Sequence, residues 1–399
     1  MIRKSIIAIA ALVTLTGCGQ GQGRNFMPVA AEITTFEIVR VVGIDKSEDK
    51  PGHVEVTIIA ERAEEAPEEG FGGVTQEMAS ATGPTAFEAM SKLRSKLDRK
   101  QTFGYVDYII FGEGAAADDL TRYTDFPARY PEFRYSPKVF IARGGSAKDL
   151  LESTSSGDMF IVDALDNFKS NVDNRSDVKL VRYIDLMNML AREDFAVVLP
   201  AIEGREPEDE KLFDGDLPEK KVAAAGYAVI RDFELAGYFD SDITRGYNFL
   251  VGNVRTCTYS VPDGYGGMTG LDVLGAGTRV IPHFYGDALI GVTYQINVGA
   301  SIAERRSRVD IHTPEQLARL SNRLAAAIER EAREAVDKSQ EFGIDCFRLG
   351  DAIKMRHPYR WRKIENDWRE IYRNLDIEVV AVPRIRCEYD LREPGGNYR

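Results

Sequence analysis

Cys18 is the residue whose surroundings point most clearly to a chemical reaction at its side chain. It closes the sequence Leu-Thr-Gly-Cys at residues 15–18, and this order matches the lipobox of bacterial lipoproteins, whose cysteine sulfur receives a diacylglycerol. Two basic residues at positions 3 and 4 and an apolar run over residues 6–15 precede it, as in a secretory signal. We therefore predict a lipoprotein signal peptide over residues 1–17, which is removed so that lipidated Cys18 becomes the first residue.

This segment also fits an ordinary secretory peptide with an incidental cysteine, or an uncut membrane anchor, and both stay open. The apolar run is shorter than the about 20 residues that a spanning helix needs, which favours cleavage. In lipoproteins of this type the new amino terminus can also be acylated, for example with palmitate, and two acyl chains are about the minimum for stable anchoring. Residues 18–35 begin with a Gly- and Gln-rich stretch, so we expect them to form a flexible tether.

The remaining cysteines and the histidines show no metal-binding pattern. Cys257, Cys346 and Cys387 are an odd number and lack the CxxC spacing of structural zinc sites. Either two of them form a disulfide outside the cytoplasm, or they are buried thiols. Neither HExxH nor HxH spacing occurs among the histidines, which are His53, His283, His312 and His357. We therefore predict no metal site and no cofactor.

The serines and glycines that could belong to a catalytic motif lack the required context. Ser146 follows two glycines but no GxSxG elbow is present, so we expect it to cap the following helix. Ser47 and Lys50 match SxxK only within an acidic turn. The glycines of residues 264–270 miss the GxGxxG spacing and predict a loop or hairpin, and the acids of residues 64–69 predict a solvated loop. The sequence thus predicts a protein that is not an enzyme.

Composition bounds the size and the partners of the folded part. The 399 residues are 44% hydrophobic, which is enough for two or three domains. The formal net charge is -12, and losing the basic signal peptide would make the mature chain more acidic still. Nucleic acid is therefore not an expected partner.

The elements that follow the tether predict an α/β region over residues 36–205, which could contain two subdomains. Alternating and continuous apolar runs indicate strands. The capping box of Thr85 and Glu88 begins a helix with Phe87, Met90, Leu93 and Leu97 on one face. Residues 61–83 are expected to be a long exposed loop. The expected strands are 36–45, 54–58, 106–111 and 138–142, with further helices near 115–123 and 180–190.

A charged linker, residues 206–221, is expected to precede a C-terminal α/β domain, residues 222–399. Thr313, Pro314 and Gln316 give a long helix its cap and first turn, and Trp361 and Trp368 are expected on the buried face of a helix over 359–372. The expected strands are 223–230, 235–239, 255–261, 277–283, 289–298 and 377–385. The predicted fold class is α/β (α+β), multidomain, with mixed or antiparallel sheets each flanked by helices.

The motifs, in their order along the chain, resemble the Ger(x)C family, the lipoprotein C subunit of nutrient germinant receptors in spore-forming bacteria. The resemblance spans nearly the whole mature chain. The matching positions are Val42–Asp45, Thr85–Met90, Phe103–Gly104, Arg129, Pro131, Glu132, Arg134, Leu199–Pro200, Gly226–Ile230, Gly237, Thr244–Gly246, Asp345, Gly350, Pro358, Trp361 and Trp368.

This resemblance implies a lipoprotein of sporulating bacteria that is anchored through Cys18 on the extracytoplasmic face of the inner spore membrane, or of the cell membrane otherwise. It implies membrane-embedded A and B receptor subunits as partners. The family usually has Trp-Asp after the lipidated cysteine, where this chain has Gly19 and Gln20, and often a histidine where it has Tyr105. A receptor subunit and a divergent paralogue therefore both stay open. The alternative is a solute-binding lipoprotein of a membrane transporter, which would bind a small molecule.

Overall fold

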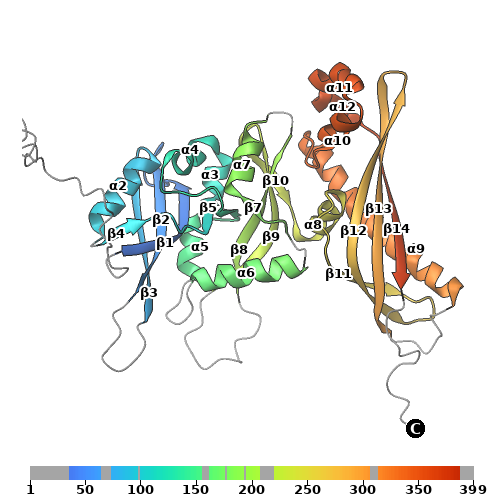
Figure 1. The fold of residues 1–399 in the computed structure, drawn as a ribbon, viewed down its shortest axis with the longest axis horizontal. Helices are drawn as coiled ribbons and strands as arrows, with labels where there is room; N and C mark the ends of the chain where they lie inside the picture. The colour runs from blue at the N-terminus through green and yellow to red at the C-terminus, as the bar shows by residue number, and fades with distance from the viewer. Residues whose placement is uncertain are drawn as a thin grey trace, which may run out of the picture.

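The computed structural model describes residues 36–63, 73–97, 99–154, 161–175, 178–192, 195–206, 220–305 and 313–386. The signal peptide, Cys18 and the tether lie outside the described residues, as do the acids of residues 64–69, most of the expected linker, His312 and Cys387. Two β-sheets with helices packed on them form the described part (Figure 1). The predicted α/β class with mixed sheets is confirmed.

The first sheet has ten strands in the order β10-β9-β8-β6-β5-β1-β2-β3, with β4 beside β1 and β7 beside β6. Its central neighbours β1, β5, β6 and β8 run parallel, whereas β2, β3, β9 and β10 extend the two sides in antiparallel fashion. The strands are β1 Phe36–Lys46, β2 Val54–Ala63, β3 Val74–Gly83, β4 Lys100–Thr102, β5 Tyr108–Gly112, β6 Lys138–Ala142, β7 Val181–Arg182, β8 Val197–Arg205, β9 Lys221–Arg231 and β10 Glu234–Phe239.

Helices cover both faces of this sheet. Every residue of β5 is buried, as expected for a continuous apolar strand in the middle of a parallel region. Tyr108 and Ile110 join the core beneath α5 and α6, whereas Ile109 and Phe111 join the core beneath α2, α3, α4 and α7. The helices are α2 Ala86–Lys96, α3 Glu113–Ala117, α4 Thr121–Arg129, α5 Ala147–Thr154, α6 Ile161–Arg175 and α7 Tyr183–Leu190.

Two expectations for this half need correction. Residues 74–83 were expected in an exposed loop, but they form β3, which pairs with β2 from Val54–Gly83 to Ala63–Val74. Only two of the ten residues of β3 are buried, so its sequence carries little hydrophobic signal, and pairing with β2 determines its conformation. Thr85 caps α2 as predicted, accepting from the Glu88 N–H at 3.2 Å. Phe87, however, is 63% exposed and does not join the buried face.

The second sheet has the order β11-β12-β13-β14, with a long β12–β13 hairpin and β14 parallel to β13. Helix α9 packs along it, and α10 to α12 lie beside the turn of the hairpin (Figure 1). The elements are α8 Ser241–Leu250, β11 Cys257–Pro262, β12 Met268–Tyr285, β13 Ala288–Arg305, α9 Pro314–Phe342, α10 Leu349–Arg356, α11 Pro358–Ile364, the 3-10 turn Glu365–Asp367, α12 Trp368–Asn374 and β14 Ile377–Arg386.

Helix α9 begins and ends as its sequence predicts, but the next helix does not. The Thr313 hydroxyl accepts from the Gln316 N–H at 3.3 Å, and α9 ends at Gly343, whose φ of 68° suits glycine. The single helix expected over residues 359–372 is divided by the turn Glu365–Asp367. Those three residues are all exposed and include two weak helix formers, Asn and Asp, so neither packing nor propensity holds an α-helix there.

One continuous core joins the two sheets. The cluster beneath α5 and α6 includes Tyr227 and Phe239 of the first sheet together with Tyr247, Phe342 and Phe347 of the second half. Strands β9 and β10, which follow the expected linker, pair with β8 in the first sheet. Strands from both sides of residues 206–221 are therefore hydrogen-bonded to each other in one sheet. A domain division at that segment stays a prediction.

Candidate functional site

The predicted lipid attachment site and the predicted absence of a metal site both stay predictions. Cys18 precedes the first described residue, Phe36, so its modification stays a prediction. The described helices include none with the length and apolar character needed to cross a bilayer. In the same part of the chain, no group of three or more His, Cys, Asp or Glu side chains is placed to hold a metal ion.

Asp45, which ends the first family-like motif, caps a helix from a distance. Its carboxylate is 2% exposed and accepts the N–H groups of Ala147 (2.7 Å) and Lys148 (3.1 Å) at the start of α5. Burial raises the pKa of Asp45 to about 6, against the opposing effect of these two hydrogen bonds. A Cβ on Gly112 would overlap this carboxylate. Asp45 therefore fixes α5 against the sheet, which is a structural role.

Arg245, which is partly exposed, forms a polar group with the buried Glu331 and Tyr259 between α8, α9 and β11. The Arg245 Nε donates to Glu331 Oε2 at 2.8 Å, and the Tyr259 hydroxyl donates to the same oxygen at 2.6 Å. The guanidinium lies 4.1 Å from the centre of the Tyr259 ring. Burial lowers the pKa of Arg245, but the hydrogen bond and charge of Glu331 outweigh burial and hold that pKa above its ordinary value. Burial and the neighbouring carboxylate raise the pKa of Tyr259.

Two glycines let backbones approach closely, Gly246 at this contact and Gly226 between β9 and β10. A Cβ on Gly246 in α8 would overlap the Glu331 carbonyl oxygen in α9. A Cβ on Gly226, whose φ is 84°, would overlap the Phe239 carbonyl oxygen. We call this contact, with Arg245, Gly246, Tyr259 and Glu331, the α8–α9 joint. The Thr-Arg-Gly motif at residues 244–246 therefore lies where α8 packs closely against α9.

Asp345 organises a second contact, between the C-terminal helices and the first sheet. Its carboxylate is 1% exposed and accepts the N–H groups of Phe347 (3.0 Å) and Gly350 (2.9 Å). Burial raises the pKa of Asp345 to about 6, against the effect of its backbone hydrogen bonds. Its own carbonyl oxygen accepts the Ala196 N–H at 3.1 Å. A Cβ on Gly350 would lie 2.6 Å from the Trp361 ring, so the glycine makes room for the tryptophan.

Both tryptophans belong to the core, as predicted. Trp361 and Trp368 are each 2% exposed, and their rings meet edge to face at 5.1 Å between centroids. Two ion pairs reinforce this region from outside: Arg192 binds Asp351 through two hydrogen bonds of 2.9 and 2.7 Å, and Arg369 binds Asp232. Asp345, the two tryptophans and these ion pairs therefore attach α10–α12 to the first sheet.

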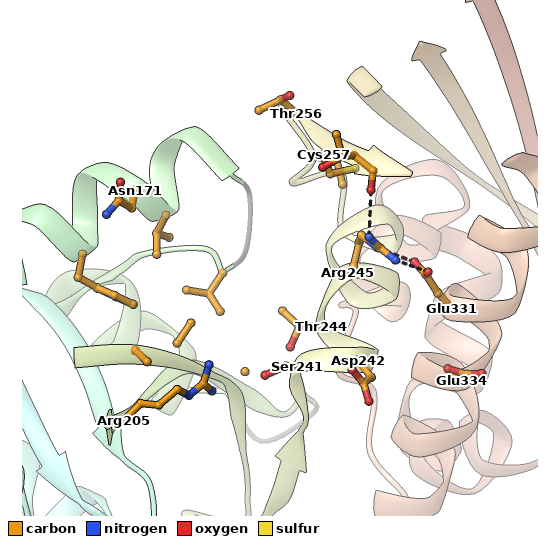
Figure 2. Close-up of a pocket in the computed structure, with 18 of the residues that line it drawn as sticks. Asn171, Arg205, Ser241, Asp242, Thr244, Arg245, Thr256, Cys257, Glu331 and Glu334 are labelled. Carbon is orange, nitrogen blue, oxygen red and sulfur yellow. Dashed lines mark hydrogen bonds and ion pairs between the residues drawn. The ribbon is translucent and has the colours of Figure 1, made fainter. Parts of the chain in front are cut away.

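An open cleft of about 1180 Å³ lies next to the α8–α9 joint, between α6, β9, α8, β11 and α9. Figure 2 shows Asn171 and Arg205 on one side and Thr256, Cys257 and Arg245 on the other, with Arg245 directed to Glu331. The described residues that line the cleft include arginines and carboxylates but neither histidine nor lysine. Such a lining could hold a polar solute, and it offers no imidazole or amine as a general base.

The remaining sequence candidates have structural roles. Ser146 caps α5 as predicted, accepting the Asp149 N–H at 2.9 Å. The Ser47 hydroxyl accepts the Lys50 N–H within the β1–β2 turn. Residues 264–270 form the turn of the β11–β12 hairpin and the start of β12. Cys346 is a buried thiol and is not bonded to Cys257.

Sequence reasoning missed the long-range partners of these residues. Arg245 and Glu331 are 86 positions apart, and no local periodicity links them. The only signal for Asp45 is a carboxylate directly after an apolar strand. A carboxylate directly after an apolar strand is typical either of a ligand-binding residue or of a residue that caps a helix near the end of the strand.

The chain matches two families along most of its length. Residues 30–204 match the family described as spore germination protein N-terminal domain, and residues 225–387 match the spore germination B3/GerAC-like C-terminal family. Asp45 lies in the first matched range, and the α8–α9 joint and Asp345 lie in the second.

Individual relatives agree with these matches. The chain is 20% identical over 390 residues to the putative spore germination protein YfkR of Bacillus subtilis (strain 168), covering 96% of each chain. It is 22% identical over 160 residues to spore germination protein B3 of the same strain, covering 40% of this chain and 42% of that protein.

A solved structure supports the fold. The crystal structure of the GerBC protein superposes with a TM-score of 0.53 and 17% identity, covering 86% of this chain and 96% of the other. At this identity the likeness concerns the fold alone. The two family matches show that the chain belongs to the GerAC-like family of spore germination proteins.

Proposed function

We propose that this protein is a lipid-anchored, non-enzymatic subunit of a nutrient germinant receptor, held on the extracytoplasmic face of the spore's inner membrane by Cys18. It would act there with membrane-embedded A and B subunits. The observation that carries the proposal is the match of both halves to spore germination families. The lipobox at residues 15–18 supports the anchor.

The described structure is consistent with an assembly role. Motif residues such as Asp45, Gly246 and Asp345 hold elements together instead of facing an open site. A lipid anchor raises the concentration of the folded body near membrane partners, so that a modest interface suffices for a complex.

Deletion of the gene in its sporulating host tests the proposal. Because a receptor subunit acts only when a dormant spore senses its surroundings, nutrient-triggered germination should fall while growth and spore formation continue. Germination on nutrients would be followed by loss of spore refractility, with a non-nutrient trigger as the control. Normal germination on every nutrient tested, together with failed uptake of one solute, would instead support the solute-binding alternative.

The cleft beside the α8–α9 joint is the feature that favours this second function. A bound solute should stabilise the folded body, by about 2.7 kcal/mol at a hundred times its dissociation constant. Thermal unfolding of the non-lipidated chain with candidate germinants and transporter solutes would detect it. Stabilisation by one solute, abolished by Arg205→Ala on the open side of the cleft, would identify the site.

A further inference from the structure

Helices α10 and α11 carry a concentration of positive charge that is unusual for this chain. Residues 352–363 contain five Lys or Arg and no Asp or Glu, although the whole chain has a net charge of -12. Lys354, Arg356 and Arg362 are exposed. Among the described residues, none of these three forms an ion pair with a carboxylate, whereas Arg192, Arg348 and others nearby do.

Large apolar side chains project from the same surface. Met355 and Tyr359 are each 80% exposed, and Tyr285, which ends β12 beside the β12–β13 turn, is 81% exposed. Large apolar side chains that are exposed together on neighbouring elements are typical of a surface that meets another molecule. We call Tyr285, Lys354, Met355, Arg356, Tyr359 and Arg362 the basic tip.

The basic tip is held rigidly by the residues beneath it. Ile353, Trp361 and Ile364 bury the inner side of α10 and α11. Lys363 pairs with Asp287 of the turn at 2.6 Å, and Arg360 lies 4.4 Å from the Phe284 ring. The helices and the turn therefore form one end of the second half, as Figure 1 shows.

The combination of side chains selects the partner. Tyrosine and methionine beside lysine and arginine without carboxylate partners suit the headgroup layer of a bilayer, where apolar groups enter the acyl boundary and cations meet phosphates. A nucleic acid offers phosphates but no acyl boundary that the exposed apolar side chains could enter. Charge complementarity requires a negatively charged surface.

We propose that the basic tip binds the headgroups of anionic phospholipids, as a second membrane contact besides the lipid at Cys18. The inference rests on the membrane location in the proposed function. Its geometry is independent of the anchor, because the basic tip lies in α10, α11 and the β12–β13 turn. Two contacts would fix the orientation of the body on the membrane, whereas a single flexible attachment would leave it free to rotate.

Vesicle binding by the mature chain without its lipid tests the proposal separately from the anchor. The Cys18→Ala chain, produced without the signal peptide, should co-sediment with vesicles of phosphatidylcholine and phosphatidylglycerol, and much less with phosphatidylcholine alone. Binding should fall as salt rises, because salt screens exposed charges.

Two matched double variants locate the contact. Lys354→Ala with Arg362→Ala should weaken binding about 25-fold, since each cation near an anionic surface contributes about fivefold. Arg129→Ala with Arg333→Ala removes the same charge from the exposed sites on α4 and α9 and should leave binding nearly unchanged. Met355→Ala with Tyr359→Ala keeps the charge and should also weaken binding. Unchanged unfolding midpoints show that the variants are folded.

Equal losses from both charge-removing variants, or no binding to phosphatidylglycerol vesicles, would overturn the proposal. Binding to spore membranes but not to vesicles of their extracted lipids would also overturn it, because the partner would then be a membrane protein. Each of these results leaves the role of Cys18 to be decided by fractionation of the lipidated protein.

Discussion

The α8–α9 joint and the basic tip differ in whether their arginines are paired with a carboxylate. Arg245 in the joint binds the carboxylate of Glu331, which is 9% exposed, whereas Arg362 in the basic tip is exposed beside the ring of Tyr359 and has no carboxylate partner among the described residues. The joint contains residues by which the chain resembles its family, and it connects the two sheets. Shared motifs therefore report how this fold is held together, and contacts with other molecules must be sought on surfaces such as the basic tip.

The largest expected effect on stability is a difference between two alanine substitutions, one at a buried aromatic residue and one at an exposed aromatic residue two positions away. Trp361→Ala should lower the free energy of unfolding by about 3–5 kcal/mol, because it empties a core position. Tyr359→Ala should change that free energy by about 0.5 kcal/mol or less, because its ring is 80% exposed. Chemical denaturation of the non-lipidated chain measures both. Similar midpoints for the two variants would show that the tryptophan is not part of the core.

The buried carboxylate of Asp345, at the contact between the C-terminal helices and the first sheet, should make the free energy of unfolding depend on pH. Burial raises the pKa of Asp345 to about 6, above its unfolded value of about 3.9, so the folded state binds more protons between these values. Its stabilising contribution is complete below about pH 4 and is lost as pH rises through 6, a change of up to about 3 kcal/mol.

Asp345→Asn tests this sign. The variant should be less stable than the parent at pH 4, because an amide cannot accept the same set of N–H groups. The deficit should shrink toward pH 7, since only the parent loses stability by ionising this group. Denaturation curves for both chains at several pH values give the difference. A deficit that stays constant or grows with pH would mean that the carboxylate is ionised in the fold throughout.

The smallest of these stability effects concerns backbone approach at the joint. Gly246→Ala should cost about 1–3 kcal/mol, because the added methyl group forces α8 away from α9. Gly277→Ala is the matched control, since a Cβ there meets nothing within 4 Å. An unfolding midpoint that drops equally for both variants would show that loss of glycine, and not the close contact, is responsible.

Local sequence patterns predict individual helices and strands more successfully than they predict tertiary contacts. The strand expected at 138–142 is β6 to the residue, and the caps at Thr85 and Thr313 begin α2 and α9. These features depend on neighbours within a few positions. By contrast, β3 depends on pairing with β2, and Arg245 on a glutamate 86 positions away. Sequence periodicity contains no information about such distant partners.

The family could be predicted from the order of motifs, whereas the surfaces for partners could not. The five Lys and Arg residues within residues 352–363 are visible in the sequence. Their exposure beside Tyr285, however, depends on how α10 and α11 pack against the β12–β13 turn. That packing is a tertiary property, and it separates Tyr359, which is exposed, from Trp361, which is buried.

Germination of spores that carry Cys18→Ala as the only copy of the gene tests the central claim most directly. The change removes the predicted lipid attachment site while leaving the described residues intact, so the folded protein should be made but lost from the membrane fraction. Nutrient-triggered germination should then fall toward that of the deletion strain, because the local concentration at the membrane is lost. Wild-type germination rates with the variant protein absent from the membrane fraction would contradict the account.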